Sequence, residues 1–137
     1  PDVIESLNGR VLFHGIRVKP GMPTMLSVVK ETPVLSLSGN PFAVEALFEV
    51  LAGGYLTDME ASRYLQKNQM KALKQTFVKT GKMKRIVKGR CDESGVYLPQ
   101  IQKNGQLKNG IGSNCLVIFP EGERTYTEGE AVRVIRI

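Results

Sequence analysis

The sequence predicts a two-part fold, an α/β unit followed by a small all-β unit, and three observations support this reading. Residues 11–53 contain apolar runs of strand length that lead into an apolar helix. Residues 73–137 contain short strands separated by turns, as in a small antiparallel sheet or open barrel. The net charge is −2 over residues 1–66 and +8 over residues 67–137. We therefore expect two domains, 1–68 and 69–137.

The first part is expected to hold a sheet and two helices. Asn40 is a preferred N-cap and Pro41 a preferred first helical residue, so a helix should begin there and end at Gly53-Gly54. One apolar stripe of this helix should pack on the sheet: Ala43, Val44, Leu47, Phe48 and Leu51. The remaining elements are strands at 11–18, 25–29 and 34–37, a turn at 30–33 and a second helix at 58–66.

The second part is expected to be all β. A hairpin turn at 92–95 should join two of its strands, and an Asn/Gly/Lys-rich stretch at 102–112 should form a long loop. The strands are expected at 73–78, 85–91, 96–101, 115–119 and 131–137.

Length and composition indicate a cytoplasmic globular protein. The chain has 137 residues, 42% of them hydrophobic, which is enough for a real core. It has no apolar run of about 18 residues and no basic, apolar leader at its start, so neither a membrane span nor a signal peptide is expected. Cys91 and Cys115 have no C-x-x-C spacing, and the single histidine, His14, is distant in sequence. Buried free thiols are expected rather than a metal site.

A candidate anion site lies where apolar strands lead into glycine-proline turns. Lys19-Pro20-Gly21 follows one strand, and Gly39-Asn40-Pro41 follows another and opens a helix. Free backbone N–H groups converge at a helix start, and Lys19 could add a charge beside them. The plain alternatives are a solvent-exposed lysine and a simple helix cap. A second basic feature, nine cations without an acid between Lys67 and Arg90, is most often a solvated face.

Two stretches of the chain resemble a known family. The sequence V-L-F-H-G-I-R-V-K-P-G-M-P-T, followed by S-L-S-G-N-P-F-A-V, resembles the closing part of the catalytic domain of MoeA-type molybdopterin molybdotransferases, the group that includes the gephyrin E domain. Further on, S-N-C-L-V-I-F-P-E-G and E-G-E-A-V-R-V-I resemble the C-terminal domain of the same family. The order and spacing of these motifs agree along nearly the whole chain.

The resemblance implies a fold and an activity. The fold would be the C-terminal part of a MogA-like three-layer α/β domain, followed by a small β-barrel-like domain. Enzymes of this family insert molybdate into adenylylated molybdopterin and release AMP, use magnesium, and act as homodimers. Substrate-binding positions follow from the motifs: Lys19, Pro20, Gly21 and Pro23 match K-P-G-x-P, Gly39, Asn40 and Pro41 match G-N-P, and Lys88 replaces the arginine of an F-x-R strand.

The resemblance covers the last third of such an enzyme. The Gly-rich S-G-G-x-S loop and the acidic residues that hold metal and nucleotide precede this point in the family. We therefore expect the Mg²⁺ ligands upstream of this chain and no turnover by the 137 residues alone; no catalytic residue is assigned. Two other classes stay open: a basic nucleic-acid-binding module, which the single aromatic of the basic run (Phe77) disfavours, and a scaffold or interaction module.

Overall fold

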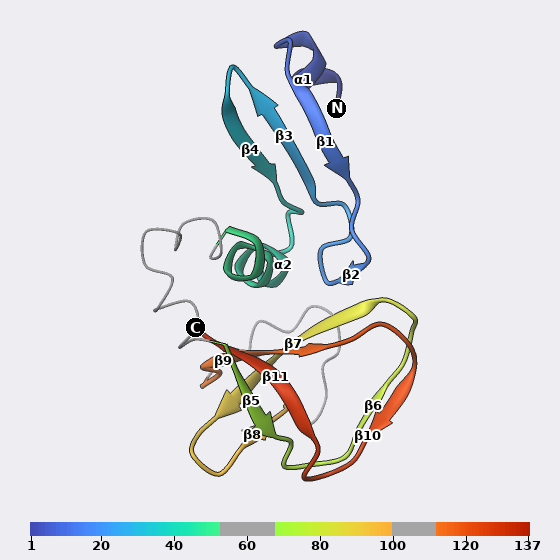
Figure 1. Ribbon diagram of the computed structural model, residues 1–137, viewed down its shortest axis with the longest axis vertical. Coiled ribbons are helices and arrows are strands. Elements are labelled where there is room, and N and C mark those ends of the chain that lie inside the picture. The colour runs from blue at the N-terminus through green and yellow to red at the C-terminus, as the bar shows by residue number, and fades with distance from the viewer. Residues whose placement is uncertain (53–67, 100–111) are drawn as a thin grey trace.

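The computed structural model describes residues 1–52, 68–99 and 112–137, which form a mostly β structure with few helices. Figure 1 shows a small sheet at the N-terminal end, a helix across the middle, and a strongly curved sheet that carries the C-terminus. The expected helix at 58–66, the glycine stop at 53–54 and nearly all of the expected loop at 102–112 lie outside the described residues. The division into domains at residue 68 stays a prediction.

Helical elements are few, and most strands follow one another directly along the described chain. The helical elements are α1 (Asp2–Ser6), α2 (Pro41–Leu47) and its continuation as a π-helix, η1 (Phe48–Ala52). The strands are β1 (Arg10–His14), β2 (Val18–Lys19), β3 (Met25–Val29), β4 (Thr32–Ser36), β5 (Asn68–Ala72), β6 (Phe77–Lys79), β7 (Lys84–Cys91), β8 (Val96–Tyr97), β9 (Cys115–Phe119), β10 (Arg124–Tyr126) and β11 (Ala131–Arg136).

The N-terminal sheet is antiparallel with the order β1-β3-β4. The expected β3–β4 hairpin is confirmed, but its turn has two residues instead of four, since Val29 pairs with Thr32. Lys30 and Glu31 both have positive φ, 47° and 69°, which matches the right-handed twist of a tight hairpin. The expected start of this strand at residue 34 was too late, because Pro33 is tolerated on an edge strand that needs no further donor.

The second sheet joins both parts of the chain. Its order is β2-β7-β9-β11-β5, and β8 pairs with the far end of β7. Strand β2, which comes from the first part, runs parallel to β7 with Val18 opposite Lys84 and Lys19 opposite Arg85. Strands β6 and β10 form a separate two-stranded sheet. The expected strands at 85–91, 115–119 and 131–137 are confirmed to within a residue at each end.

The expected strand at 73–78 is wrong, because the chain changes partners there. Strand β5 ends at Ala72, and the backbone N–H of Leu73 donates to Glu130 O (2.9 Å) while that of Lys74 donates to Val96 O (2.9 Å). Leu73 is fully buried at this crossing, so its apolar character reflects a corner rather than a continuous strand. Strand β6 begins only at Phe77, and β10, which pairs with it, was not expected.

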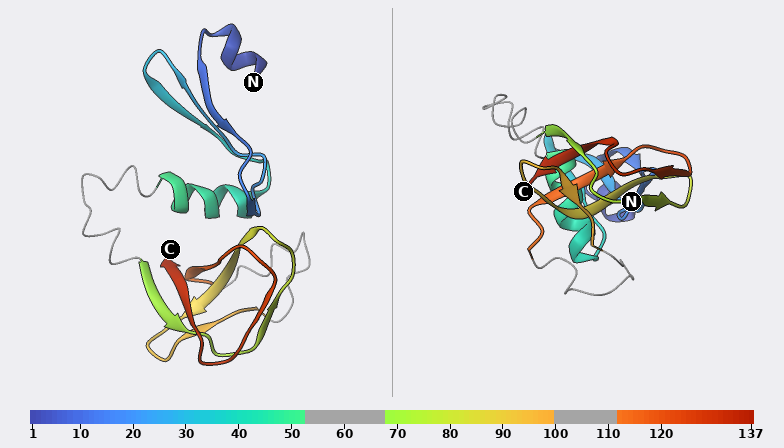
Figure 2. Two further views of the ribbon diagram at one scale, coloured as in Figure 1. Left: turned by 45° about the vertical axis from the view of Figure 1, so that its right-hand side comes forward. Right: turned by 90° about the horizontal axis from the view of Figure 1, so that it is seen from below.

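Helix α2 lies across the second sheet, as the left view of Figure 2 shows. Ala46 and Leu47 form one buried cluster with four sheet residues: Ile86, Leu116, Ile118 and Ile135. The expected apolar stripe was right for two of its five residues. Ala43 and Leu47 are buried, whereas Val44, Phe48 and Leu51 are 39%, 48% and 36% exposed. The helix is apolar on more than one side, so spacing alone does not select the packed face.

A second core fills the inside of the curved sheet. Phe119 stands at its centre, stacked on Phe77 at 4.6 Å between ring centroids and packed edge-on against Tyr126 at 4.8 Å. Lys79 is also buried here, at 1% exposure, and its Nζ donates to the carbonyl oxygens of Gly81 and Gly122. One cation of the basic run is therefore structural rather than solvated. None of the described helices is long and apolar enough to cross a membrane.

The buried Lys79 ammonium group should contribute measurably to folding. Lys79→Met keeps the apolar stem but removes both hydrogen bonds to the carbonyl groups, so we expect a loss of about 1–3 kcal/mol in the free energy of unfolding by urea. Lys82→Met is the control, because Lys82 is exposed in the adjoining turn and the charge change is identical. Equal stability of the two variants would contradict a structural role for Lys79.

Candidate anion-binding site

The Lys19 turn is held by hydrogen bonds within its own loop. The buried Thr24 donates through Oγ1 to Gly21 O at 2.7 Å, and Gly15 N–H donates to Thr24 O at 2.8 Å. Ile16 N–H donates to Met22 O at 2.9 Å, which closes the loop a second time. Lys19 itself is exposed at the end of β2, and the Lys19–Pro20 peptide bond is cis. The lysine therefore projects from a fixed backbone.

Gly21 fixes this turn against helix α2. It has a φ of +104°, and a Cβ atom built on it would lie 2.0 Å from Leu47 Cδ1. Leu47 is itself 1% exposed and packed among sheet residues, so it has little room to move aside. Glycine is thus required here both for the backbone conformation and for the close approach of turn and helix.

The Gly39-Asn40-Pro41 segment begins α2, as the sequence predicts. Asn40 Oδ1 accepts a hydrogen bond from Ala43 N–H at 3.1 Å, and Asn40 O accepts one from Val44 N–H at 3.0 Å. Gly39, Asn40 and Pro41 are all exposed, and no heavy atom lies within 4 Å of the position of a Gly39 Cβ. Helix capping is confirmed, whereas anion binding by this segment stays a prediction.

Lys88 is held by α2. Its Nζ lies 2.6 Å from Glu45 Oε2 and 5.5 Å from the centroid of the Phe42 ring. The Lys88 side chain is 19% exposed and that of Glu45 is 42% exposed. This pair ties β7 to the helix, so Lys88 has a structural partner in addition to any role in substrate contact, which stays a prediction.

Strand β7 separates the candidate residues into two groups. Alternate residues of a strand point to opposite faces. Ile86 joins the α2 cluster, so Lys88, two residues on, shares the helix side, while Arg85 and Val87 face the other side. Because Lys19 is in register with Arg85, the two cations lie next to each other on that other side. The structure thus brings Lys19 close to Arg85, a residue that the sequence motifs do not single out, and places both on the face opposite Lys88. Pro23 is exposed in the same loop as Lys19.

The described residues do not fit a magnesium site. No three His, Cys, Asp or Glu side chains come together anywhere in the described ranges. Cys91 and Cys115 are free and buried, as expected. Burial, together with the neighbouring Cys91, raises the pKa of the Cys115 thiol to about 12, so this thiol is neutral near pH 7 and a poor metal ligand or nucleophile. No step of a reaction is therefore assigned to a metal bound here.

Comparison with known proteins shows which proteins this chain is similar to. No family model matches the chain. The chain is 25% identical over 140 residues to the molybdopterin molybdenumtransferase of Staphylococcus aureus, covering 98% of this chain and 33% of that protein. It is also 25% identical over 142 residues to the Bacillus subtilis molybdopterin molybdenumtransferase, covering 100% of this chain and 33% of that protein.

A solved structure supports the same relationship. The crystal structure of a molybdopterin biosynthesis MoeA protein from Pyrococcus horikoshii matches with a TM-score of 0.79 and 28% identity, over 98% of this chain and 34% of the other. The chain is thus related to proteins of molybdenum cofactor biosynthesis. In particular, it is homologous to part of the MoeA-type molybdopterin molybdenumtransferases and spans about a third of their length.

The close approach of Gly21 to Leu47 gives a sharp test of how the Lys19 turn is held. Gly21→Ala adds a methyl group that collides with Leu47, whereas Gly15→Ala adds one at a similar positive φ, +89°, with its nearest neighbour 3.8 Å away. Both changes should cost about 1 kcal/mol for the left-handed backbone, and Gly21→Ala should cost about 1–3 kcal/mol more, measured by urea unfolding. Equal losses for the two variants would show that turn and helix are not in tight contact.

Proposed function

We propose that this chain supplies the substrate-contacting turn of a molybdopterin molybdenumtransferase, the enzyme that inserts molybdate into adenylylated molybdopterin with release of AMP. Homology along 98% of the chain supports the assignment to this enzyme class. The observation that carries the site proposal is the Lys19 turn, which is exposed at its lysine yet fixed by Thr24 and Leu47.

The chemistry of the substrate agrees with the charge at this turn. Adenylylated molybdopterin carries phosphate groups and a dithiolene, so it is strongly anionic. Lys19 and the in-register Arg85 place two cations side by side on one face. A neighbouring cation, Arg17, is 3.5 Å from Glu121 and is thereby partly neutralised. In this proposal Lys19 contacts the substrate as a point charge, while Pro20, Gly21 and Pro23 shape the turn that presents it.

The remaining parts of the enzyme stay outside this chain in the proposal. The magnesium ligands lie in the two thirds of the enzyme that the chain does not span, and the working enzyme is a homodimer. Within this chain, Gly39, Asn40 and Pro41 border the substrate. Lys88 lies on the other face of β7 from Lys19 and is paired with Glu45, so the proposal leaves it out of the substrate contact. The 137 residues alone should then bind substrate without inserting molybdate. Molybdate insertion by this chain in isolation would contradict that division of labour.

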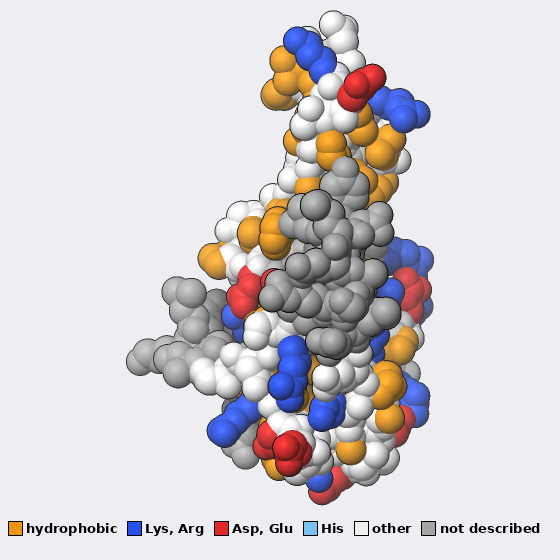
Figure 3. Space-filling model, turned by 60° about the vertical axis from the view of Figure 1, so that its left-hand side comes forward, with side chains coloured by type: hydrophobic (Ala, Val, Ile, Leu, Met, Phe, Trp, Pro, Cys, Tyr) orange, Lys and Arg blue, Asp and Glu red, His pale blue; other side chains and the backbone are white. Residues whose placement is uncertain are grey.

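Fewer cations of the basic run are free to contact a phosphate backbone than the sequence suggests, which weakens the nucleic-acid alternative. Lys79 is buried and Lys88 is paired with Glu45, so neither is available to a phosphate backbone. The scaffold alternative has an exposed apolar surface on α2, the side chains of Val44, Phe48 and Leu51. Figure 3 shows hydrophobic side chains reaching the surface at the level of this helix, but nothing identifies an occupant.

The site proposal is tested by equilibrium titration of the chain with adenylylated molybdopterin. Lys19→Ala should weaken binding by about tenfold, because it removes a charge-assisted contact worth roughly 1.5 kcal/mol. Lys82→Ala removes an equal charge from an exposed turn and should leave the affinity unchanged. A short single-stranded RNA is titrated in parallel.

Two results would overturn the site proposal. Equal affinities for Lys19→Ala, Lys82→Ala and the unaltered chain would remove Lys19 from the substrate contact. Tight, salt-sensitive binding of the RNA with no binding of the pterin would favour the nucleic-acid reading instead.

A further inference from the structure

Arg85 lies directly beside Lys19 on the second sheet. Strand β2 runs parallel to β7, and Lys19 is in register with Arg85. Adjacent strands are about 4.8 Å apart, and residues in register point to the same face, so the two long cationic side chains begin close together. Like charges at this spacing repel each other. The fold therefore holds a repulsive pair at the turn to which the proposed function assigns the substrate.

The charge of this pair is not compensated by the described residues. Within the described ranges, no carboxylate pairs with Lys19 or Arg85. The turn that follows β9 carries two carboxylates near them, but both have other partners. Glu121 Oε1 lies 3.5 Å from Arg17 Nε, and Glu123 Oε1 accepts a hydrogen bond from the backbone of the 80–82 turn at 3.0 Å. An anionic ligand is therefore the natural counter-charge for the pair.

The Arg85 side chain is half-buried and lies near an aromatic ring. Its guanidinium carbon is 6.0 Å from the centroid of the Phe77 ring, at the outer limit of cation–π attraction. Phe77 is itself fixed, because it stacks on the fully buried Phe119 with 4.6 Å between ring centroids. The guanidinium group is therefore partly ordered before any ligand binds, which lowers the entropy cost of binding one.

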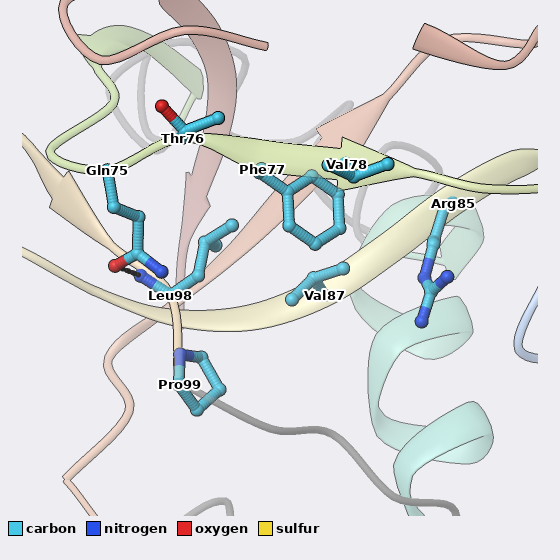
Figure 4. Close-up of a pocket in the computed structure, with 8 residues that line it drawn as sticks. All are labelled: Gln75, Thr76, Phe77, Val78, Arg85, Val87, Leu98 and Pro99. Atoms are coloured by element: carbon cyan, nitrogen blue, oxygen red, sulfur yellow. Dashed lines mark hydrogen bonds between the residues drawn. The ribbon is translucent and has the colours of Figure 1, made fainter. Parts of the chain in front are cut away.

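Arg85 also borders a hollow of about 260 Å³ between β6 and β7. Figure 4 shows Arg85 at one end of the hollow and Gln75 at the other, with Phe77 and Val87 between them. Val87 is 1% and Leu98 is 5% exposed, so little apolar surface is open there and the accessible lining is mainly polar. The surroundings of Arg85 suit a charged, hydrogen-bonding group rather than an apolar ring.

We propose that Arg85 is a second substrate-binding residue of the Lys19 site, and that the two cations together hold one phosphate group of the substrate. The planar fork of arginine donates two parallel hydrogen bonds to a pair of phosphate oxygens, while lysine acts on the same group as a point charge. A phosphate group between the two cations replaces their repulsion by attraction to a shared anion. This inference rests on the proposed function, because it takes the substrate of the Lys19 turn as given.

The first test uses the unaltered chain, labelled with ¹⁵N. It is titrated with adenylylated molybdopterin and, separately, with inorganic pyrophosphate, which keeps phosphate groups and lacks the pterin. The side-chain Nε–H resonance of Arg85 should shift saturably with both ligands. That of Arg90, which is exposed on the opposite face of β7, should stay in place. This comparison does not depend on the folding of a variant.

Three arginine variants then separate charge from geometry. Arg85→Gln should weaken binding of adenylylated molybdopterin by about tenfold to a hundredfold, because it removes a charge-assisted contact. Arg85→Lys should also weaken binding, by several-fold, because it keeps the charge and loses the second parallel hydrogen bond. Arg90→Gln makes the same charge change on the other face of β7 and should have no effect. Urea unfolding of each variant checks that its fold is retained.

The outcomes distinguish this inference from the proposed function. If Lys19→Ala weakens binding and Arg85→Gln does not, the Lys19 site stands and the inference fails. If no saturable binding is found, or if neither substitution changes the affinity, both fail together. Equal losses for Arg85→Gln and Arg90→Gln would indicate general charge attraction, and an unchanged affinity for Arg85→Lys would show that the planar fork is not used. Either result contradicts the inference.

Discussion

The structure depends on the packing of helix α2 against the second sheet. Ala46 and Leu47 are buried among Ile86, Leu116, Ile118 and Ile135, which come from β7, β9 and β11. Full burial of one leucine side chain contributes about 1.5–3 kcal/mol, and its removal to alanine typically costs about 2–5 kcal/mol. This single contact surface joins residues that are up to 89 positions apart in sequence, from Ala46 to Ile135, so helix α2 and the face of the sheet toward it bury each other.

The same contact decides where the candidate functional residues lie. Leu47 packs against the sheet and also lies against Gly21. The helix therefore fixes the position of the Lys19 turn relative to the sheet. Strand β2 then pairs with β7 and places Lys19 beside Arg85, while Lys88 remains on the other face, paired with Glu45. Strand β7 therefore separates Lys19 and Arg85 on one face from the Lys88–Glu45 pair on the other. The homology to molybdopterin molybdenumtransferases covers all of these residues, and the chain spans about a third of the relatives' length.

The sequence predicted those features that depend on local chemistry. The Asn40 cap, the β3–β4 hairpin and the apolar strand β9 follow from residue preferences within a few positions, and each is confirmed. Features that depend on distant partners were missed or misread. Leu73 looks like a strand residue because it is apolar. The backbone, however, changes partner there, since Leu73 N–H donates to Glu130 O and the next N–H donates to Val96 O.

The misassigned residues share one cause. Lys79 resembles its neighbours in a basic run, but carbonyl groups from two separate turns enclose it. Arg85 carries no motif, and its position beside Lys19 follows only from parallel pairing between segments more than sixty residues apart. Val44, Phe48 and Leu51 are exposed on α2, although the sequence assigned them to the core. Their helical spacing matches that of a packed face as closely as the spacing of the buried residues does. Burial and pairing with remote segments are properties of the fold and leave little trace in local sequence.

The most direct test of this account is native-state hydrogen exchange of three amides: Leu47 in α2, Val117 in β9, and Gly15, which donates to Thr24 in the Lys19 loop. If α2 joins the two parts into one cooperative unit, Leu47 and Val117 should exchange with opening free energies equal to within about 1 kcal/mol, and Gly15 should approach them. Exchange of Leu47 and Gly15 several kcal/mol more easily than Val117 would show that the helix and the Lys19 turn open independently of the sheet. That result would contradict the claim that this contact holds the candidate site in place.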